Sequence, residues 1–164
     1  MQGLLKHPTV PHRIEETEDK GRGVFANAPI KKGKYVCEYK TTQVYKREQR
    51  ARHEEEYATN MEACMILEAQ TKDGWICLDA TRRFGTVGRL MNHAPKKSAT
   101  VKPFKPLKVN GKWRVAFIAA RDIEEGEELT WDYGCPPEGQ EWLMRCRRTP
   151  ARDMQGMPLI YSIF

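Results

Sequence analysis

The chain has 164 residues and a formal net charge of +6 at pH 7, with 40% hydrophobic and 30% charged residues. Such a length and composition are typical of one folded domain with a buried core, and they exclude a disordered chain. Every apolar run is too short to cross a bilayer, and the amino terminus (MQGLLKHPTVPHR) lacks the apolar core of a secretory signal, so we expect an intracellular protein.

Most apolar segments are short and rich in β-branched or aromatic residues, which is typical of strands. Strands are predicted, in chain order, at residues 23–28, 35–39, 64–69, 75–80, 113–120 and 128–133. Asp73-Gly74 and Asn110-Gly111 accept the positive φ angles of tight turns, and each therefore predicts a hairpin. The sequence predicts one compact, mainly β domain.

A few short helices complete the prediction. Residues 43–57 are dense in charged side chains, and Arg50–Glu54 and Arg52–Glu56 lie at the i,i+4 spacing that supports a surface helix. A second, shorter helix is predicted at residues 141–147, after the break made by two prolines and a glycine.

Two glycines flank an arginine in the segment Lys20-Gly21-Arg22-Gly23, just before a predicted strand. Such glycines let the backbone approach a ligand and expose its N–H groups, although a plain turn with a surface arginine explains them as well. The segment is not a phosphate-binding GxGxxG motif, because the third glycine is missing and a strand follows instead of a helix.

Two later segments are also open to two explanations each. Asn92-His93 follows the apolar pair Leu90-Met91, so it forms either a buried polar corner or a site for a nucleoside or amino-acid-like cofactor. An acidic turn at residues 122–128 leads into a strand that ends in Trp131-Asp132-Tyr133-Gly134, which is either an aromatic part of the core or part of a site. Neither segment identifies a function by itself.

The three segments together, KGRGVFA, RLMNH and GEELTWDYG in this order, resemble the SET methyltransferase family over residues 13–142. The stretches CLDATRRFGTVGRLMNHA and IAARDIEEGEELTWDYG are most similar to the branch that monomethylates lysine twenty of histone H4. The resemblance implies a SET fold of small curved sheets, in which the Asn-His and Asp-Tyr-Gly segments cross in a C-terminal pseudoknot. It implies an N-terminal extension at residues 1–12, the SET domain with its C-terminal lid helix at 13–148, and a tail at 149–164.

The resemblance also implies a protein-lysine N-methyltransferase that uses S-adenosyl-L-methionine. By similarity, the residues expected to bind this cofactor are Lys20, Gly21, Arg22, Cys64, Arg89, Asn92, His93 and Trp142. Cys64 stands where a tyrosine is common in the family, and Trp142 stands where an aromatic lid closes over the adenine. Tyr133 matches the catalytic tyrosine, and Tyr39 and Trp131 are expected to line the channel for the substrate lysine.

Two residues depart from the family pattern. Ala94 follows the Asn-His pair where a serine or cysteine is common, and Trp131 replaces the usual tyrosine or phenylalanine two residues before Tyr133. An indole there should crowd the channel, so we expect monomethylation at most, or loss of activity. The alternative is therefore a catalytically impaired SET domain that binds a histone or a nucleosome.

Five cysteines, an odd number with no CxC or CxxC spacing, predict free thiols and no zinc or other metal site. The cysteine-rich zinc segment that follows the Asp-Tyr-Gly motif in the family is absent, in agreement with this prediction.

Basic residues gather in three clusters, at residues 46–52, 96–108 and 145–148. Such clusters favour an anionic partner. With the family resemblance, they predict a histone tail or nucleosome as substrate, contact with nucleosomal DNA, and a location on chromatin in the nucleus. We expect a monomer that does not associate with membranes.

Overall fold

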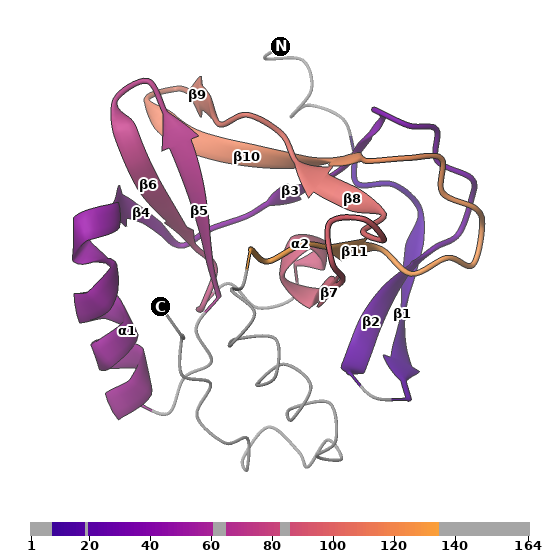
Figure 1. The fold of residues 1–164 in the computed structure, drawn as a ribbon, viewed down its shortest axis with the longest axis horizontal. Helices are drawn as coiled ribbons and strands as arrows, with labels where there is room; N and C mark the ends of the chain where they lie inside the picture. The colour runs from indigo at the N-terminus through magenta and orange to yellow at the C-terminus, as the bar shows by residue number, and fades with distance from the viewer. Residues whose placement is uncertain (1–7, 19, 61–64, 83–85, 135–164) are drawn as a thin grey trace.

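The computed structural model describes residues 8–18, 20–60, 65–82 and 86–134. This part of the chain is mainly β, and its strands form four small sheets (Figure 1), which confirms the predicted fold class. No helix within it is both long and apolar enough to cross a membrane. The predicted helix at residues 141–147, together with Cys64 and Trp142, lies outside the described residues.

The largest sheet has the order β3-β10-β8, with β9 also paired to β10, and its strands are β3 (Tyr35–Tyr39), β8 (Val101–Pro103), β9 (Leu107–Val109) and β10 (Lys112–Ala119). A three-stranded sheet has the order β4-β6-β5, with β4 (Gln43–Lys46), β5 (Ile66–Thr71) and β6 (Gly74–Asp79). The two-stranded sheets pair β1 (His12–Thr17) with β2 (Gly21–Ala26), and β7 (Asn92–His93) with β11 (Thr130–Trp131). The helical segments are η2 (Arg47–Gln49), α1 (Arg50–Thr59) and α2 (Val87–Leu90).

Both predicted hairpins are confirmed. Gly74 has a φ of 111° where β5 turns into β6, and Asn110 and Gly111 have φ of 49° and 76° between β9 and β10. Asn110 and Gly111 are the two central residues of their turn, and both have the positive φ that such hairpin turns favour. In the other hairpin Thr71 pairs with Gly74, so Lys72 and Asp73 form the turn and Gly74 takes the positive φ directly after it.

The strand predicted at residues 128–133 is shorter in the structure and is divided between two partners. Glu128 forms a bridge with Phe25, and the Leu129 N–H donates to the Val24 carbonyl at 2.7 Å. The next two residues pair with a different segment, since Thr130–Trp131 forms β11 alongside β7. This change of partner brings the carboxyl-terminal motif into contact with both earlier motifs.

The helix predicted at residues 43–57 is wrong over its first turns, because Gln43–Lys46 form β4 and pair with β6. Side chains on β4 reach the buried Asp79 of β6, and this tertiary contact overrides the local helical pattern. The predicted pair of Arg50 and Glu54 is present in α1, with Nε and Oε1 2.5 Å apart. Glu56 pairs with Arg82 instead of with Arg52.

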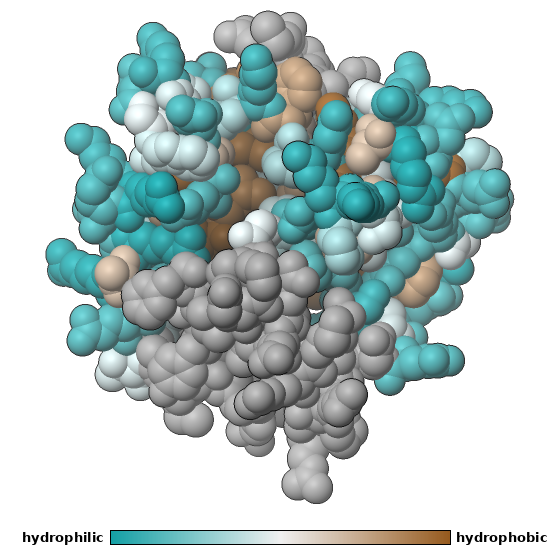
Figure 2. All heavy atoms as spheres, viewed as in Figure 1, coloured by the Kyte–Doolittle hydropathy of each residue, from teal (hydrophilic) through white to brown (hydrophobic). Residues whose placement is uncertain are grey.

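The hydrophobic core is built mainly from side chains on or next to β2, β6, β7, β10 and β11. Its fully buried side chains include Val24, Leu78, Met91, Phe117 and Leu129. In Figure 2, hydrophobic atoms appear on this face of the molecule mainly as a narrow strip, and hydrophilic side chains surround it.

The thiols that the structure describes, Cys37 and Cys77, are buried and free, as predicted. Burial raises the pKa of Cys37 to about 12 and that of Cys77 to about 11. Both thiols therefore stay protonated and unreactive near neutral pH. The remaining cysteines lie outside the described residues.

Candidate active site

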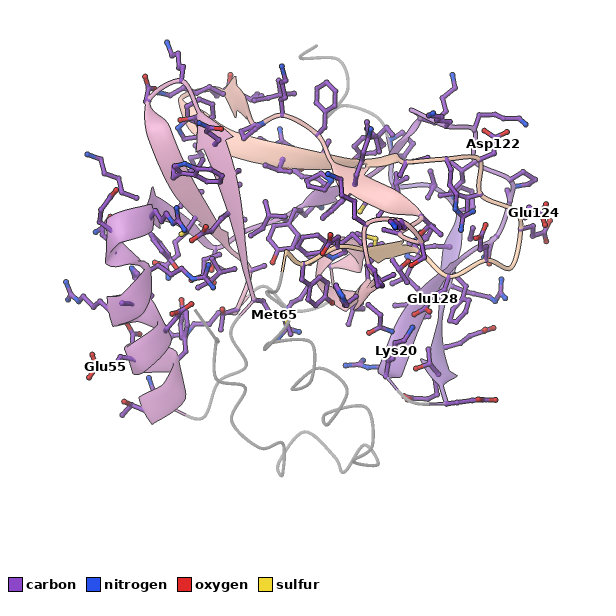
Figure 3. All side chains as sticks on the ribbon, in the orientation of Figure 1. Lys20, Glu55, Met65, Asp122, Glu124 and Glu128 are labelled. Atoms are coloured by element: carbon purple, nitrogen blue, oxygen red, sulfur yellow. The ribbon has the colours of Figure 1, made fainter. Side chains whose placement is uncertain are left out.

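Glu128 joins the three motifs of the sequence into one polar junction. Its Oε2 accepts from the Lys20 Nζ at 3.2 Å, and its Oε1 accepts from the Asn92 Nδ2 at 2.8 Å. The Asn92 amide also donates to the Arg22 carbonyl at 3.3 Å. Figure 3 shows Lys20 and Glu128 close together beside β2. The junction is half-buried, which leaves its polar groups able to reach a ligand.

Gly23 is required by the close packing of this junction. A Cβ at this position would lie 2.7 Å from the Glu128 Oε1 and 2.9 Å from the Thr17 Cγ2. The close approach predicted from the two glycines is therefore made to atoms of the protein itself. Gly21, by contrast, has a φ of 69° and open space where a Cβ would be. Its role is to turn the chain into β2.

Tyr133 is held where β7 and β11 meet. The backbone N–H of Tyr133 donates to the His93 Nδ1 at 3.2 Å, and its hydroxyl donates to the Met91 carbonyl at 2.6 Å. The His93 and Tyr133 rings also make an edge contact, with centroids 5.2 Å apart. The two contacts between His93 and Tyr133 depend on the parallel pairing of Asn92 with Thr130 and of His93 with Trp131.

Aromatic rings pack beside Tyr133. Trp131 lies 4.6 Å from Tyr133, 5.1 Å from Phe117 and 6.2 Å from Tyr39, measured between ring centroids. Tyr39 is 4% exposed, and its hydroxyl donates to the Met65 carbonyl at 3.0 Å. Trp131 is 8% exposed, and its Nε1 has no acceptor in the described part of the chain. Since buried N–H groups are normally bonded, this indole can donate to a ligand or a water.

Arg89 lies on α2, which packs against β3. Its guanidinium donates to the Thr81 carbonyl at 3.3 Å. Burial lowers the pKa of Arg89, and the nearby positive charge of Arg22 acts in the same direction. A carboxylate bound near Arg89 and Arg22 would raise the pKa of Arg89 again, because its negative charge offsets both the burial of the guanidinium and the repulsion from Arg22.

The structure thus brings most of the expected site residues together in two adjoining groups. Lys20, Arg22 and Asn92 belong to the polar junction, and Tyr39, Trp131 and Tyr133 belong to the aromatic group. The described residues contain no cluster of three or more His, Cys, Asp or Glu that could hold a metal ion. The absence of a metal from the function stays a prediction.

Glu128 was not among the residues expected from the sequence. It stands in an acidic run with Glu124, Glu125 and Glu127, and a solvated turn is the ordinary explanation for such a run. Figure 3 shows that Glu124 and Glu128 lie in different regions, with only Glu128 next to Lys20. The available signal was the position of Glu128 just before the apolar Leu129, at the start of the strand predicted for residues 128–133.

A comparison with protein families matches residues 21–134 to the SET domain. The chain belongs to the SET-domain family. The matched range starts at the glycine turn of the first motif and ends at Gly134, so it contains the polar junction except for Lys20. The predicted outer limits of the SET domain, residues 13 and 148, stay predictions.

The N-lysine methyltransferase KMT5A-A of Danio rerio is 38% identical to this SET domain over 122 residues. The alignment covers 71% of this chain but 33% of the relative, so the chain spans about a third of that protein. This similarity confirms the resemblance to the histone H4 branch that the motifs indicated.

Solved structures agree with this assignment. The crystal structure of CpSET8 from Cryptosporidium has a TM-score of 0.67 and 34% identity, and the match covers 77% of this chain and 59% of that one. The ctPRC2 complex in an autoinhibited conformation bound to S-adenosylmethionine has a TM-score of 0.61 and 28% identity, and the match covers 85% of this chain and 17% of that one.

Proposed function

We propose that this SET domain is a protein-lysine N-methyltransferase that takes its methyl group from S-adenosylmethionine. The observation that carries the proposal is the position of Tyr133 in the aromatic group, where it is held by Met91 and by His93, the chain neighbour of Asn92 in the polar junction. Membership of a family with N-lysine methyltransferases supports it. A histone tail, with H4 first among the candidates, is the substrate that the similarity to KMT5A-A favours.

The residues of the polar junction fit the cofactor chemically. S-adenosylmethionine carries an ammonium, a carboxylate, a sulfonium and an adenine. The Arg22 carbonyl offers an acceptor, Lys20 and Asn92, which Glu128 holds in place, offer donors, and Arg89 on α2 offers a further donor. We assign Lys20, Gly21, Arg22, Arg89, Asn92 and His93 to cofactor binding, and propose that Cys64 and Trp142, which lie outside the described residues, complete the site. The bound cofactor supplies a methyl group on a sulfonium, which can pass to an amine without a metal.

The aromatic group is suited to hold the substrate lysine as a neutral amine. A lysine has a pKa near 10.4 in water, so its deprotonation at neutral pH costs roughly 4 kcal/mol. Burial among Tyr39, Trp131 and Tyr133 excludes water and lowers the pKa of a bound amine. These three side chains would also restrict the direction from which the amine approaches, as alignment with a transferable methyl group requires.

Trp131 is proposed to limit the number of methyl groups added to one. Its indole is packed between Tyr39, Phe117 and Tyr133, and this leaves little room for an amine that already carries a methyl group. Trp131→Phe is expected to shift the product from monomethyl-lysine toward dimethyl-lysine and trimethyl-lysine. Mass spectrometry of a reacted H4 tail peptide measures this shift. Trimethyl-lysine formed by the unaltered protein would contradict the proposal.

The decisive experiment for the proposed function uses radiolabelled S-adenosylmethionine with nucleosomes, free histones and an H4 tail peptide. Transfer of label to a lysine is expected, and Tyr133→Phe is expected to abolish most of it while the protein still binds the cofactor. Isothermal titration measures that binding separately. A protein that binds histone but neither binds the cofactor nor transfers label would instead be the impaired binding module.

The proposed substrate places the protein on chromatin in the nucleus. A nucleosome presents DNA together with the histone tail, and the basic clusters of the chain favour such a partner. Fractionation of cells that produce the protein, with the nuclear share measured by immunoblot, tests the location.

A further inference from the structure

The two basic clusters that the structure describes differ in how far acidic side chains neutralise their charge. In the cluster at residues 46–52, Arg50 contacts Glu54 and Glu68, and Arg47 also contacts Glu68. Much of the charge of this cluster is therefore neutralised within the protein. The cluster at residues 145–148 lies outside the described residues. Of the two described clusters, the one that begins at Lys96 has no ion pair between its lysines and any acidic residue that the structure describes.

The positive charge of the chain is concentrated around this second cluster. Residues 80–121 contain eleven Lys and Arg and no Asp or Glu, whereas the rest of the chain has more acidic than basic residues. Arg82, Arg114 and Arg121 each pair with a glutamate. The lysines of this segment are all exposed, and none forms an ion pair with an acidic residue that the structure describes: Lys96, Lys97, Lys102, Lys105, Lys108 and Lys112.

Three of these lysines, Lys102, Lys105 and Lys108, lie along one edge of the largest sheet, which we call the lysine edge. β8 and β9 pair one after the other with β10, and the Phe104 N–H donates to the Ala116 carbonyl at 2.8 Å between them. Residues 101–109 therefore form a continuous outer border of the sheet (Figure 1). Lys102, Lys105 and Lys108 recur at every third residue, which is roughly 10 Å apart in extended chain.

The residues between these lysines indicate the class of partner. A free sheet edge can add a peptide strand through its backbone, but Pro103 and Pro106 have no N–H to donate. Contacts at this edge must therefore be made mainly by the lysine side chains, which are flexible point charges suited to phosphates. Lys108 is also positioned by Trp113, since its Nζ lies 5.4 Å from the centre of that ring. Duplex DNA presents about one negative charge per 1.7 Å of its axis, so each lysine can find a phosphate.

We propose that the lysine edge binds the phosphate backbone of duplex DNA. The edge begins beside the candidate active site, because Thr100, directly before β8, donates to the Glu128 carbonyl at 3.0 Å. DNA bound there lies close to the residues assigned to methyl transfer. The link to catalysis on nucleosomes rests on the proposed function, whereas the binding of DNA does not.

The test uses the 164-residue chain and a fluorescein-labelled DNA duplex, with binding followed by fluorescence anisotropy. The variant Lys102→Glu/Lys105→Glu/Lys108→Glu is compared with Lys32→Glu/Lys34→Glu/Lys72→Glu. The second variant changes the net charge equally at exposed lysines outside the edge. Affinity is measured from about 50 mM to about 200 mM salt, where each phosphate contact contributes roughly 0.9 to the slope of log K against log salt.

The edge variant is expected to lose about tenfold or more in affinity and to show a slope smaller by roughly 2 to 3, while the control variant keeps the slope of the unaltered protein. Equal losses in both variants would overturn the proposal, because net charge alone would then explain the binding. Absence of binding by the unaltered protein at the lowest salt would overturn it too.

A second measurement separates this proposal from the proposed function. With labelled S-adenosylmethionine, the edge variant is expected to methylate an H4 tail peptide at the rate of the unaltered protein, but nucleosomes more slowly. If the unaltered protein binds DNA and methylates neither substrate, the proposed function fails and the lysine edge stands. If it methylates both and the edge variant matches it on nucleosomes and on DNA, the lysine edge fails and the enzyme stands.

Discussion

Glu128→Ala is expected to weaken the binding of S-adenosylmethionine by about tenfold to a hundredfold. The substitution removes the acceptor that holds the Lys20 ammonium and the Asn92 amide, and hydrogen bonds to a charged group contribute about 1.5–3 kcal/mol. Both side chains would then be free to leave the positions in which they meet the cofactor. Isothermal titration of the purified variants with S-adenosylmethionine measures the effect.

We regard Glu128 as a positioning residue, because it acts through Lys20 and Asn92. Glu128→Gln should recover part of the affinity, since its amide oxygen can still accept from Asn92. For both variants the KM for the cofactor should rise more than kcat falls at saturating cofactor, with the thermal midpoint of Glu128→Gln close to that of the unaltered protein. Glu125→Ala, at an exposed position of the same acidic run, is the matched control. Equal cofactor affinity in Glu128→Ala and Glu125→Ala would refute the assignment.

Asp79→Ala is expected to destabilise the domain by about 3–4 kcal/mol, because it leaves several buried donors without an acceptor. Asp79 is fully buried, and its Oδ2 accepts from the Tyr57 hydroxyl at 2.5 Å and from the Tyr45 hydroxyl at 3.2 Å. The same oxygen accepts from Gln43, and Oδ1 accepts from the Thr81 N–H at 2.8 Å. These contacts tie α1 and β4 to β6.

The loss corresponds to a fall of roughly 10 °C in the thermal midpoint for a domain of this size. Circular dichroism during heating and during urea titration measures it. Tyr57→Phe, which removes one donor and keeps the ring, should cost about 1 kcal/mol. A loss below about 1 kcal/mol in Asp79→Ala would show that water takes the place of the carboxylate.

Burial also raises the pKa of Tyr45 and Tyr57, and the negative charge of Asp79 acts in the same direction. Both hydroxyls therefore remain protonated donors well above neutral pH.

The buried network around Asp79 explains why residues 43–46 form the strand β4. The charged pattern of residues 43–57 predicts a helix throughout, but Gln43 and Tyr45 reach Asp79 only when the chain pairs with β6. A contact over such a sequence distance leaves no local signal.

The sequence predicted the turns more accurately than the ends of strands. Asn110-Gly111 and Gly74 specify their hairpins because few residues tolerate the positive φ that these three positions adopt. The end of the last strand was less predictable, because residues 128–133 are uniformly favourable for a strand while the pairing partner changes at Thr130. Which strand a segment pairs with is decided by the packing of the whole domain.

The amino-acid sequence by itself determined the family and predicted Tyr133, Asn92 and His93 as site residues, since each motif depends on residue types and order within a few positions. Only the tertiary structure decided which charged side chains pair with one another and which remain exposed without a described partner. It showed that Glu128, among four similar glutamates, joins the three motifs, and that the lysines of residues 96–112 lack acidic partners in the described chain. The physical reason is that ion pairs and hydrogen bonds depend on distances of a few ångströms between residues far apart in the chain, and only the fold sets those distances.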